Sequence, residues 1–345
     1  MVPCEYEFIG KYGEGLFAFC NGGKLKNLDS DPSGGKWGYM DVEGKVIIDA
    51  QYDSAERFSD GTAQIRNGKN VSLIPNPLTS DGKKVTQSIH RNIPKANFTN
   101  DNLFVFIIGN ETYASNIMSE SSANDAELFH RYSENSLGCP ESNIHYLIDA
   151  SYANIRRKLS YMREIAEVYD GEAKFIIYYS GLGIQDLEGE RYLLPIDADF
   201  NNLKTTAIPI GDIIDIFNQI KSKYSLAIID ASFNGSDKNN KPFLNDRGVS
   251  LKLKKTTKDL RNNSMVWISA GNNGIAFNSD NENISLFSNI LMQEMNGKMN
   301  KEEIMPFVEK VNKRTKEMSL KKGKEIQSPI LYQSTDYSID NKQTF

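Results

Sequence analysis

Residues 175–183 read Phe-Ile-Ile-Tyr-Tyr-Ser-Gly-Leu-Gly, and residues 226–235 read Leu-Ala-Ile-Ile-Asp-Ala-Ser-Phe-Asn-Gly. Both stretches are apolar runs that end abruptly in small and polar residues. This pattern is typical of a buried parallel strand that delivers a loop to the carboxyl edge of a sheet. Open α/β folds bind ligands at that edge. Leu182 and Ser232, which lie in the two loops, are therefore the first candidate site positions.

Apolar strands and amphipathic helices alternate on both sides of these stretches, from residue 103 onward. This alternation predicts an α/β fold, with a mostly parallel sheet and helices on both of its faces. A hairpin is expected at 192–197. Strands are expected at 103–108, 146–148, 175–181, 226–230, 265–269 and 330–332, and helices at 122–137, 154–169, 212–222, 286–295 and 302–313.

The N-terminal part has a different sequence pattern, with short aromatic and β-branched runs between glycine turns. Residues 13–22 align with residues 59–68 at an offset of 46, and each copy ends in Asn-Gly, a strong hairpin signal. Residues 36–69 contain Trp-Gly-Tyr, Gly-Lys and Tyr-Asp in the order that resembles a WG repeat, and residues 8–24 resemble a partial copy. Such repeats are regarded as binding modules. Trp37 and Tyr39 are candidates for the module's binding surface, with a role as core aromatics as the alternative.

These sequence patterns divide the chain into four parts. Residues 1–75 are expected to form a small all-β module, and residues 76–100, with Pro77 and Pro94 among polar residues directly after Pro75, a linker. Residues 101–337 are expected to form the main α/β domain. Residues 338–345 remain as a tail.

The composition excludes several classes of protein. The 345 residues are 39% hydrophobic with a net charge of −5, which allows a large core and does not favour nucleic-acid binding. Three scattered cysteines suit a reducing compartment better than a disulfide framework. We see no signal peptide and no apolar run long enough to cross a membrane. A cytoplasmic protein without a metal ion or other cofactor is expected.

Residues 103–335 resemble the caspase-like domain (peptidase C14) in its bacterial, metacaspase-related form. The matching segments follow one another in the family's order. They are Ile108-Gly109-Asn110-x-x-Tyr113, Asn124-Asp125-Ala126, Leu147-Ile148-Asp149-Ala150, Tyr178-Tyr179-Ser180-Gly181-x-Gly183, Tyr192-Leu193-Leu194-Pro195, Asp230-Ala231-x-Phe233-x-Gly235 and Gln327-x-Pro329.

The same resemblance shows where the chain departs from the family. Leu182 stands where the family has its catalytic His, and Ser232 stands where it has its nucleophilic Cys. The two positions are 50 residues apart, which is the spacing of His and Cys in caspases. Loss of one member of a comparable hydrolytic triad lowers turnover by roughly a millionfold. No functional catalytic residue is expected, and none of His90, His130 and His145 is expected to replace the missing base.

A remnant of the family's substrate pocket is expected around Asp230. In relatives that cleave after basic residues, this carboxylate helps to bind the Arg or Lys side chain. Capping of its own loop is the alternative role. The other expected pocket residues are Gly181, Gly183, Ser269 and Asn272.

A basic run lies just beyond the Ser232 loop. Residues 236–264 hold eight Lys or Arg residues against three Asp. Such a run is usually a solvated loop. A docking site for an acidic partner is the sharper alternative.

Three functional hypotheses remain open. The first is a catalytically inactive scaffold that binds or regulates a peptide or protein partner, without contact to nucleic acid or membrane. The second is a cysteine endopeptidase directed at basic residues, seen here with its nucleophile replaced; it predicts Cys at position 232 of the natural gene. The third is a structural or assembly protein whose groove has collapsed.

Overall fold

A computed structural model describes residues 8–24, 32–41, 44–59, 62–68, 70–79, 92–114, 117–243, 259–271, 274–279, 283–321, 325–334 and 344–345. The chain divides into two compact units, Met1–Arg91 and Asn92–Phe345. His90 and Asn272 lie outside the described residues, as does most of the basic run after residue 243.

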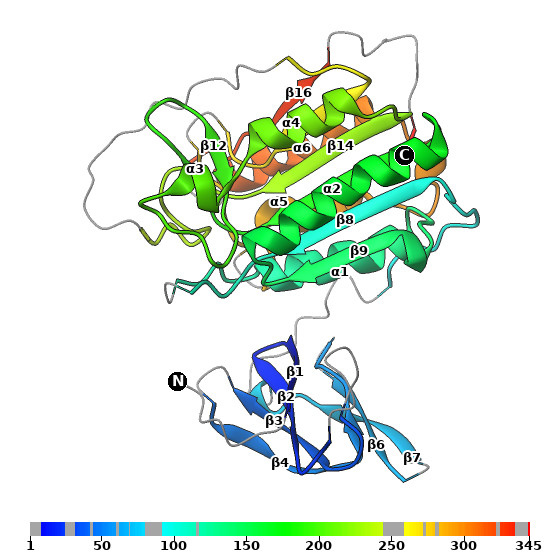
Figure 1. The fold of residues 1–345 in the computed structure, drawn as a ribbon, viewed down its shortest axis with the longest axis vertical. Coiled ribbons are helices and arrows are strands. Elements are labelled where there is room, and N and C mark those ends of the chain that lie inside the picture. Colours follow the sequence, from blue (N-terminus) through cyan, green and yellow to red (C-terminus); the bar gives the residue numbers. More distant parts are fainter. Residues whose placement is uncertain are drawn as a thin grey trace. The chain divides into compact units, whose positions relative to one another are not determined.

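The first unit is all-β, as expected (Figure 1). Strands β1 (Phe8–Gly13), β2 (Leu16–Asn21), β3 (Lys36–Asp41) and β4 (Val46–Tyr52) form an antiparallel sheet in that order. Strands β5 (Ser54–Ala55), β6 (Thr62–Asn67) and β7 (Asn70–Pro75) form a second sheet, and a 3-10 turn, η1, covers Pro77–Thr79. The two repeat copies correspond to β2 and β6, and Gly68, at φ 60°, turns the chain between β6 and β7.

Trp37 and Tyr39 are core residues, so their placement on the module's binding surface is wrong. Trp37 is 5% exposed and Tyr39 is fully buried. The Tyr39 ring packs against Phe58 with 4.5 Å between centroids, and its hydroxyl donates to the carbonyl of Glu56 at 2.6 Å. Both side chains are covered because they lie on one face of β3 and pack in the module's core with Leu16, Phe58 and Ile65. Between them, Gly38 allows β4 to approach, since a Cβ there would lie 2.4 Å from the carbonyl oxygen of Ile48.

The second unit is built on a six-stranded sheet (Figure 1). Its order is β16-β15-β14-β10-β8-β9, parallel except for β16 at one edge. The strands are β8 (Leu103–Gly109), β9 (Ile144–Ile148), β10 (Lys174–Ser180), β14 (Tyr224–Asp230), β15 (Ser264–Ile268) and β16 (Ile330–Gln333). Every residue of β8 and of β14 is buried, as the continuous apolar runs predict.

Helices cover both faces of this sheet, which confirms the predicted fold class. Helices α1 (Ser122–Asn135), α5 (Leu286–Glu294) and α6 (Ile304–Lys321) pack on one face. Helices α2 (Tyr152–Tyr169) and α4 (Ile210–Gln219) pack on the other. Strand β8 contributes to both layers, because its successive side chains point to opposite faces of the sheet. Val105 packs in the first layer and Phe106 in the second. Shorter elements are η2 (Glu141–Asn143), β11 (Gly183–Gln185), β12 (Arg191–Leu193), α3 (Leu203–Thr206), β13 (Ile208–Pro209) and η3 (Met299–Lys301).

Two segments assigned to the linker and the tail pack on this unit. Ala96 donates to the carbonyl of Asn135 at 2.6 Å, and Asn100 donates to that of Gly138 at 2.8 Å. At the other end of the chain, Phe345 is 3% exposed and packs against Phe307. The composition of such short segments does not reveal a single anchoring contact.

Two further observations concern the class of protein. Cys20 and Cys139 are buried and take part in no disulfide. Within the described ranges, no helix combines the length and the apolar character needed to cross a membrane.

Candidate functional site

The candidate site lies where the order of the parallel strands reverses. The chain passes from β8 outward to β9 and then returns to β10 on the other side of β8. The loops that leave β8, β10 and β14 meet at this carboxyl edge, which is where ligand sites form in such sheets. Asn110, directly after β8, links the end of that strand to the segments that follow β12 and β9. Its side chain donates to the carbonyl of Leu194 at 3.0 Å and accepts from the amide of Ala150 at 2.8 Å.

Leu182 is built into an apolar cluster at this edge. It is 1% exposed, and it packs with the buried side chains of Tyr113, Ile184, Tyr192 and Leu194. Its backbone is equally engaged, because its amide donates to the Tyr113 hydroxyl at 2.8 Å and its carbonyl accepts from the Tyr179 hydroxyl at 2.7 Å. The structure therefore places an apolar anchor, and no titratable group, at this position.

The Ser232 hydroxyl holds a backbone loop. It donates to the carbonyl of Ala276 at 3.2 Å and accepts from the amide of the same residue at 3.0 Å. Ser232 is 2% exposed. The hydroxyl that would have to attack a substrate is thus buried and used in two hydrogen bonds.

Neither described histidine is near Ser232. His145 lies in the amino half of β9, and its ring packs against that of Phe106 with 4.6 Å between the ring centroids. The strand register places it level with Ala227, three residues before the end of β14 and three strands away. At roughly 3.3 Å per residue and 4.8 Å per strand, that separation is well over 10 Å. His130, on α1, packs against Tyr146 on the same strand as His145.

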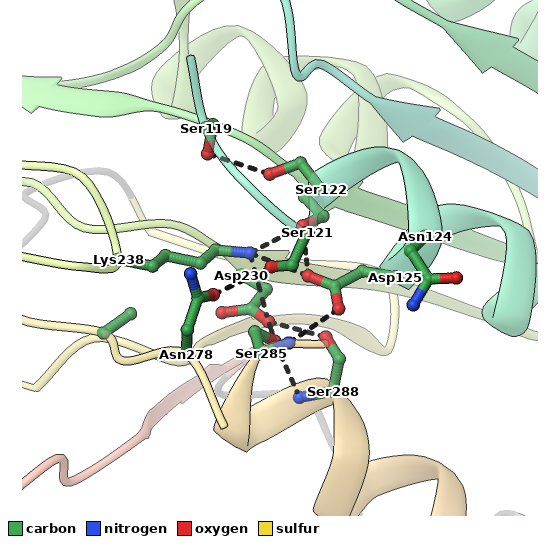
Figure 2. Close-up of polar contacts among 12 residues, drawn as sticks. Ser119, Ser121, Ser122, Asn124, Asp125, Asp230, Lys238, Asn278, Ser285 and Ser288 are labelled. Carbon is green, nitrogen blue, oxygen red and sulfur yellow. Dashed lines mark hydrogen bonds and ion pairs between the residues drawn. The ribbon is translucent and has the colours of Figure 1, made fainter. Parts of the chain in front are cut away.

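Asp230 lies at the centre of a buried polar cluster (Figure 2). It is fully buried. The Ser269 hydroxyl donates to its Oδ1 at 2.7 Å, and the Ser288 hydroxyl donates to its Oδ2 at 2.5 Å. The Ser285 hydroxyl also donates to Oδ2. Of the residues expected beside Asp230, Ser269 contacts its carboxylate, and the Gly181 amide donates to its carbonyl at 3.3 Å.

A lysine from the chain itself fills the space that was expected to receive a basic side chain. The Nζ of Lys238 lies 2.9 Å from Oδ2 of Asp125, 3.6 Å from Oδ2 of Asp230 and 2.6 Å from the hydroxyl of Ser180. Its side chain is 1% exposed. For Lys238, the interpretation of the basic run as a solvated loop is wrong. Asp230 does attract a basic side chain, and that side chain is intramolecular.

The electrostatics favour an ionised lysine. Burial by itself lowers the pKa of Lys238, but the carboxylates of Asp125 and Asp230 outweigh it and hold the pKa above its ordinary value. Burial raises the pKa of Asp125. The N-termini of two helices favour the ionised form of Asp125, since it lies in the first turn of α1 and accepts from the Ser285 amide, at the start of α5, at 2.8 Å.

The two glycines of the β10 loop, Gly181 and Gly183, allow close packing. A Cβ at Gly181 would lie 2.5 Å from the Tyr179 hydroxyl, and one at Gly183 would lie 2.6 Å from the Phe233 ring. The guanidinium carbon of Arg191 lies over this ring, 5.5 Å from its centroid. Phe233 therefore packs directly against the backbone of Gly183.

Glu111 is a further buried carboxyl of this edge. It is 5% exposed and accepts a hydrogen bond from the amide of Ala123 at 3.0 Å. It thereby satisfies a free amide in the first turn of α1, whose N-cap residue, Ser121, makes no side-chain cap. Burial raises the pKa of Glu111 from 4.5 to about 7, and the carboxylates of Asp149 and Asp125 add to the effect.

We expect the free energy of unfolding of the native chain to fall as pH rises, and we expect Glu111→Gln to abolish this fall. Below pH 4.5, Glu111 is protonated in folded and unfolded chains alike. Between pH 4.5 and about 7, the unfolded chain releases the proton while the folded chain retains it, so the free energy of unfolding falls. At about 1.4 kcal/mol per pKa unit, the fall reaches roughly 3 kcal/mol.

Urea unfolding of both proteins across this pH range measures the difference. Glu120→Gln, at a side chain that is 51% exposed, is the control. Parallel stability curves for the native chain and Glu111→Gln would contradict the assignment.

Sequence reasoning identified Asp230 and Ser269 but missed Lys238, Ser285 and Ser288. Asp125 and Ser180 lie within matched motifs, and neither is predicted as a site residue. A weak signal existed, because an aspartate in the first turn of a helix and a serine at the end of a strand both face the carboxyl edge. No local signal singles out Lys238 among the eight basic residues of its run.

Fold and site together define a caspase-like α/β protein with a closed carboxyl edge. The sequence matches the caspase domain over residues 103–337, so the chain belongs to the caspase domain family. The WG-containing repeat matches at residues 1–24 and 37–70, which confirms the resemblance of the N-terminal module.

A search of curated proteins finds no significant match. Two solved structures are similar in fold. Protein GSU0716 from Geobacter sulfurreducens is 11% identical with a TM-score of 0.48, covering 70% of this chain and 97% of its own. Caspase-1 from Spodoptera frugiperda is 13% identical with a TM-score of 0.47, covering 71% of this chain and 92% of its own.

Proposed function

We propose that this chain is a catalytically inactive caspase-domain protein that acts as a regulatory or binding scaffold for a peptide or protein partner. One observation carries the proposal. The positions that match the family's His and Cys hold a leucine packed into an apolar cluster and a serine whose hydroxyl is bonded to the Ala276 backbone. Nucleophilic catalysis needs a base within hydrogen-bond reach of the nucleophile.

The alternative of an inactivated endopeptidase explains Ser232 only. A cysteine at this position in the natural gene would still face Leu182 rather than a base. The apolar cluster around Leu182 is complete, with Tyr113, Ile184, Tyr192 and Leu194 against it. This packing favours the hypothesis of an inactive scaffold over that of an endopeptidase in which only the nucleophile is replaced.

The third hypothesis, a structural protein with a collapsed groove, gains from the burial of this edge. Leu182, Ser232 and Asp230 are each at most 2% exposed. We therefore propose that a partner does not bind at this edge while these residues are buried.

We propose a cytoplasmic location, with which the free thiols of Cys20 and Cys139 accord.

We expect the purified chain to leave Arg-, Lys- and Asp-terminated reporter peptides uncleaved. A serine-reactive fluorophosphonate should leave Ser232 unlabelled, because the hydroxyl is buried and has no base. Peptide release is followed by fluorescence, and labelling by mass spectrometry. A catalytically active serine hydrolase under the same conditions is the positive control. Stoichiometric labelling of Ser232, or turnover that disappears in Ser232→Ala, would overturn the proposed function.

A further inference from the structure

The internal repeat of the first unit can be followed strand by strand in the structure. The offset of 46 residues places Ala18 and Cys20 of β2 at the positions of Gln64 and Arg66 in β6. Each of these strands has an antiparallel partner that follows it in the chain, β3 after β2 and β7 after β6. Strand β7 therefore occupies, in the second copy, the place that the Trp-Gly-Tyr strand β3 has in the first.

The strand register identifies the residues that replace the two aromatic side chains. Two cross-strand pairs of the first copy have equivalents in the second: Cys20–Trp37 corresponds to Arg66–Val71, and Ala18–Tyr39 corresponds to Gln64–Leu73. Val71 therefore lies where the first copy has Trp37, and Leu73 lies where it has Tyr39.

The equivalent faces of the two copies differ in what covers them. In the first copy the two aromatic side chains are at most 5% exposed, because β6 contributes Ala63 and Ile65 to the core that they share. Side chains alternate along a strand, so Val71 and Leu73 point away from this core. Val71 is 58% exposed and Leu73 is 66% exposed. Among the described residues, this face has no further repeat over it.

A terminal repeat that faces water usually has a polar outer face. Gln64 and Arg66 follow this rule, and both are exposed. Val71 and Leu73, two residues apart on the same strand, do not follow it. We call these four residues the β7 face. The face has one charged group, and the carboxylate of Asp53 interacts with that charge.

The internal packing of the unit indicates what fits the β7 face. In the first copy the equivalent face is covered by a sheet of the same module, through an interface of aliphatic and aromatic side chains. That covering sheet, β5-β6-β7, already uses its inner face within the unit. A second copy of the chain can cover the β7 face, because a two-fold contact lets one surface patch pack against itself.

We propose that the β7 face is a self-association surface: two copies of the chain stack these faces about a two-fold axis, with Val71 and Leu73 of each copy at the centre of the contact. Strands β6 and β7 have six residues each, so the sheet is about 20 Å long and its face covers roughly 300 Å². A standard interface buries about 800 Å² per partner, so the association is weak. The inference goes beyond the proposed function, because it concerns the first unit and can hold or fail whether or not the second unit is catalytically active.

Sedimentation equilibrium of the full chain tests the proposal. We expect reversible monomer–dimer association between about 10 µM and about 1 mM, the range of weak specific contacts. Leu73→Glu brings two like charges together at the centre of the contact and should raise the dissociation constant by roughly tenfold or more. Circular dichroism verifies that the variant is folded.

Ser72→Glu is the matched control on the same strand. Ser72 pairs with Ile65, so its side chain lies on the opposite face of β7 and its replacement should leave the dissociation constant unchanged. A native chain that stays monomeric, or a dimer that Leu73→Glu does not weaken, would overturn the proposal. So would an equal loss of association in Ser72→Glu, because it would indicate pairing through the edge of β7 instead of its face.

Cross-linking at position 73 covers the case in which a glutamate variant does not fold. Stacked sheets lie about 10 Å apart, so a bis-maleimide of about that reach should join Leu73→Cys to the same residue of a second copy. Leu187→Cys, at a residue of the second unit that is 77% exposed, is the control. Both chains also carry Cys4→Ser, and Cys20 and Cys139 are buried. We expect covalent dimers to form roughly tenfold faster in Leu73→Cys, because association raises the local concentration of the two thiols. Equal rates would overturn the stacking of the β7 faces.

Discussion

Leu182→His should lower the free energy of unfolding by about 3 kcal/mol, although it restores the residue that the family has at this position. The leucine is 1% exposed, and burial of such a side chain is worth about 1.5–3 kcal/mol. An imidazole placed among apolar side chains without a partner adds a further penalty of about 1–3 kcal/mol. For a domain of this size the melting temperature should fall by about 6–10 °C, measured by circular dichroism.

Leu187→His is the matched control. Leu187 lies in the turn between β11 and β12 and is 77% exposed, so its replacement should change stability by less than about 0.5 kcal/mol. If the two variants melt at the same temperature, Leu182 is exposed in solution. The carboxyl edge would then be open, and peptide binding in the groove would gain over the closed arrangement.

Lys238→Met should be at least as destabilising, by about 3–5 kcal/mol. The substitution keeps the length of the side chain and removes its charge, which leaves Asp125 and Asp230 buried without their cation. Breaking a buried ion pair on one side costs more than the pair contributes, because the remaining charge stays desolvated. Urea denaturation of the native and variant chains measures the difference.

Two further variants test the charge argument. Lys241→Met, on the same loop, removes an exposed ion pair with Glu120 and should cost at most about 1 kcal/mol. Lys238→Met combined with Asp230→Asn removes one carboxylate charge as well and should recover part of the lost stability, which a double-mutant cycle quantifies. Equal losses in Lys238→Met and Lys241→Met would show that the Lys238 ion pairs do not form in solution.

The architecture follows from local sequence patterns. The continuous apolar runs of β8, β10 and β14 predict buried parallel strands, and the amphipathic spacing of α2 predicts its contact with the sheet. Because the carboxyl ends of parallel strands share one edge, the sequence also predicts that the Leu182 and Ser232 loops lie together. These conclusions need only the periodicity of side chains along one element.

The contents of the site depend on contacts between distant parts of the chain. Lys238 pairs with Asp125 across 113 residues, and Ser285 reaches Asp230 across 55. Trp37 and Tyr39 are core residues because side chains from other strands of the module pack over their face of β3, and Phe345 is buried because it packs against Phe307 of α6.

The sequence by itself therefore determined the α/β fold and the position of the carboxyl edge, since periodicity and motif order are local properties. Only the tertiary structure decided that this edge is closed and that a lysine of the chain fills its pocket. The physical reason is that a buried charge pairs with an opposite charge that lies close to it in three dimensions. No local pattern distinguishes Lys238 from the other basic residues of its run.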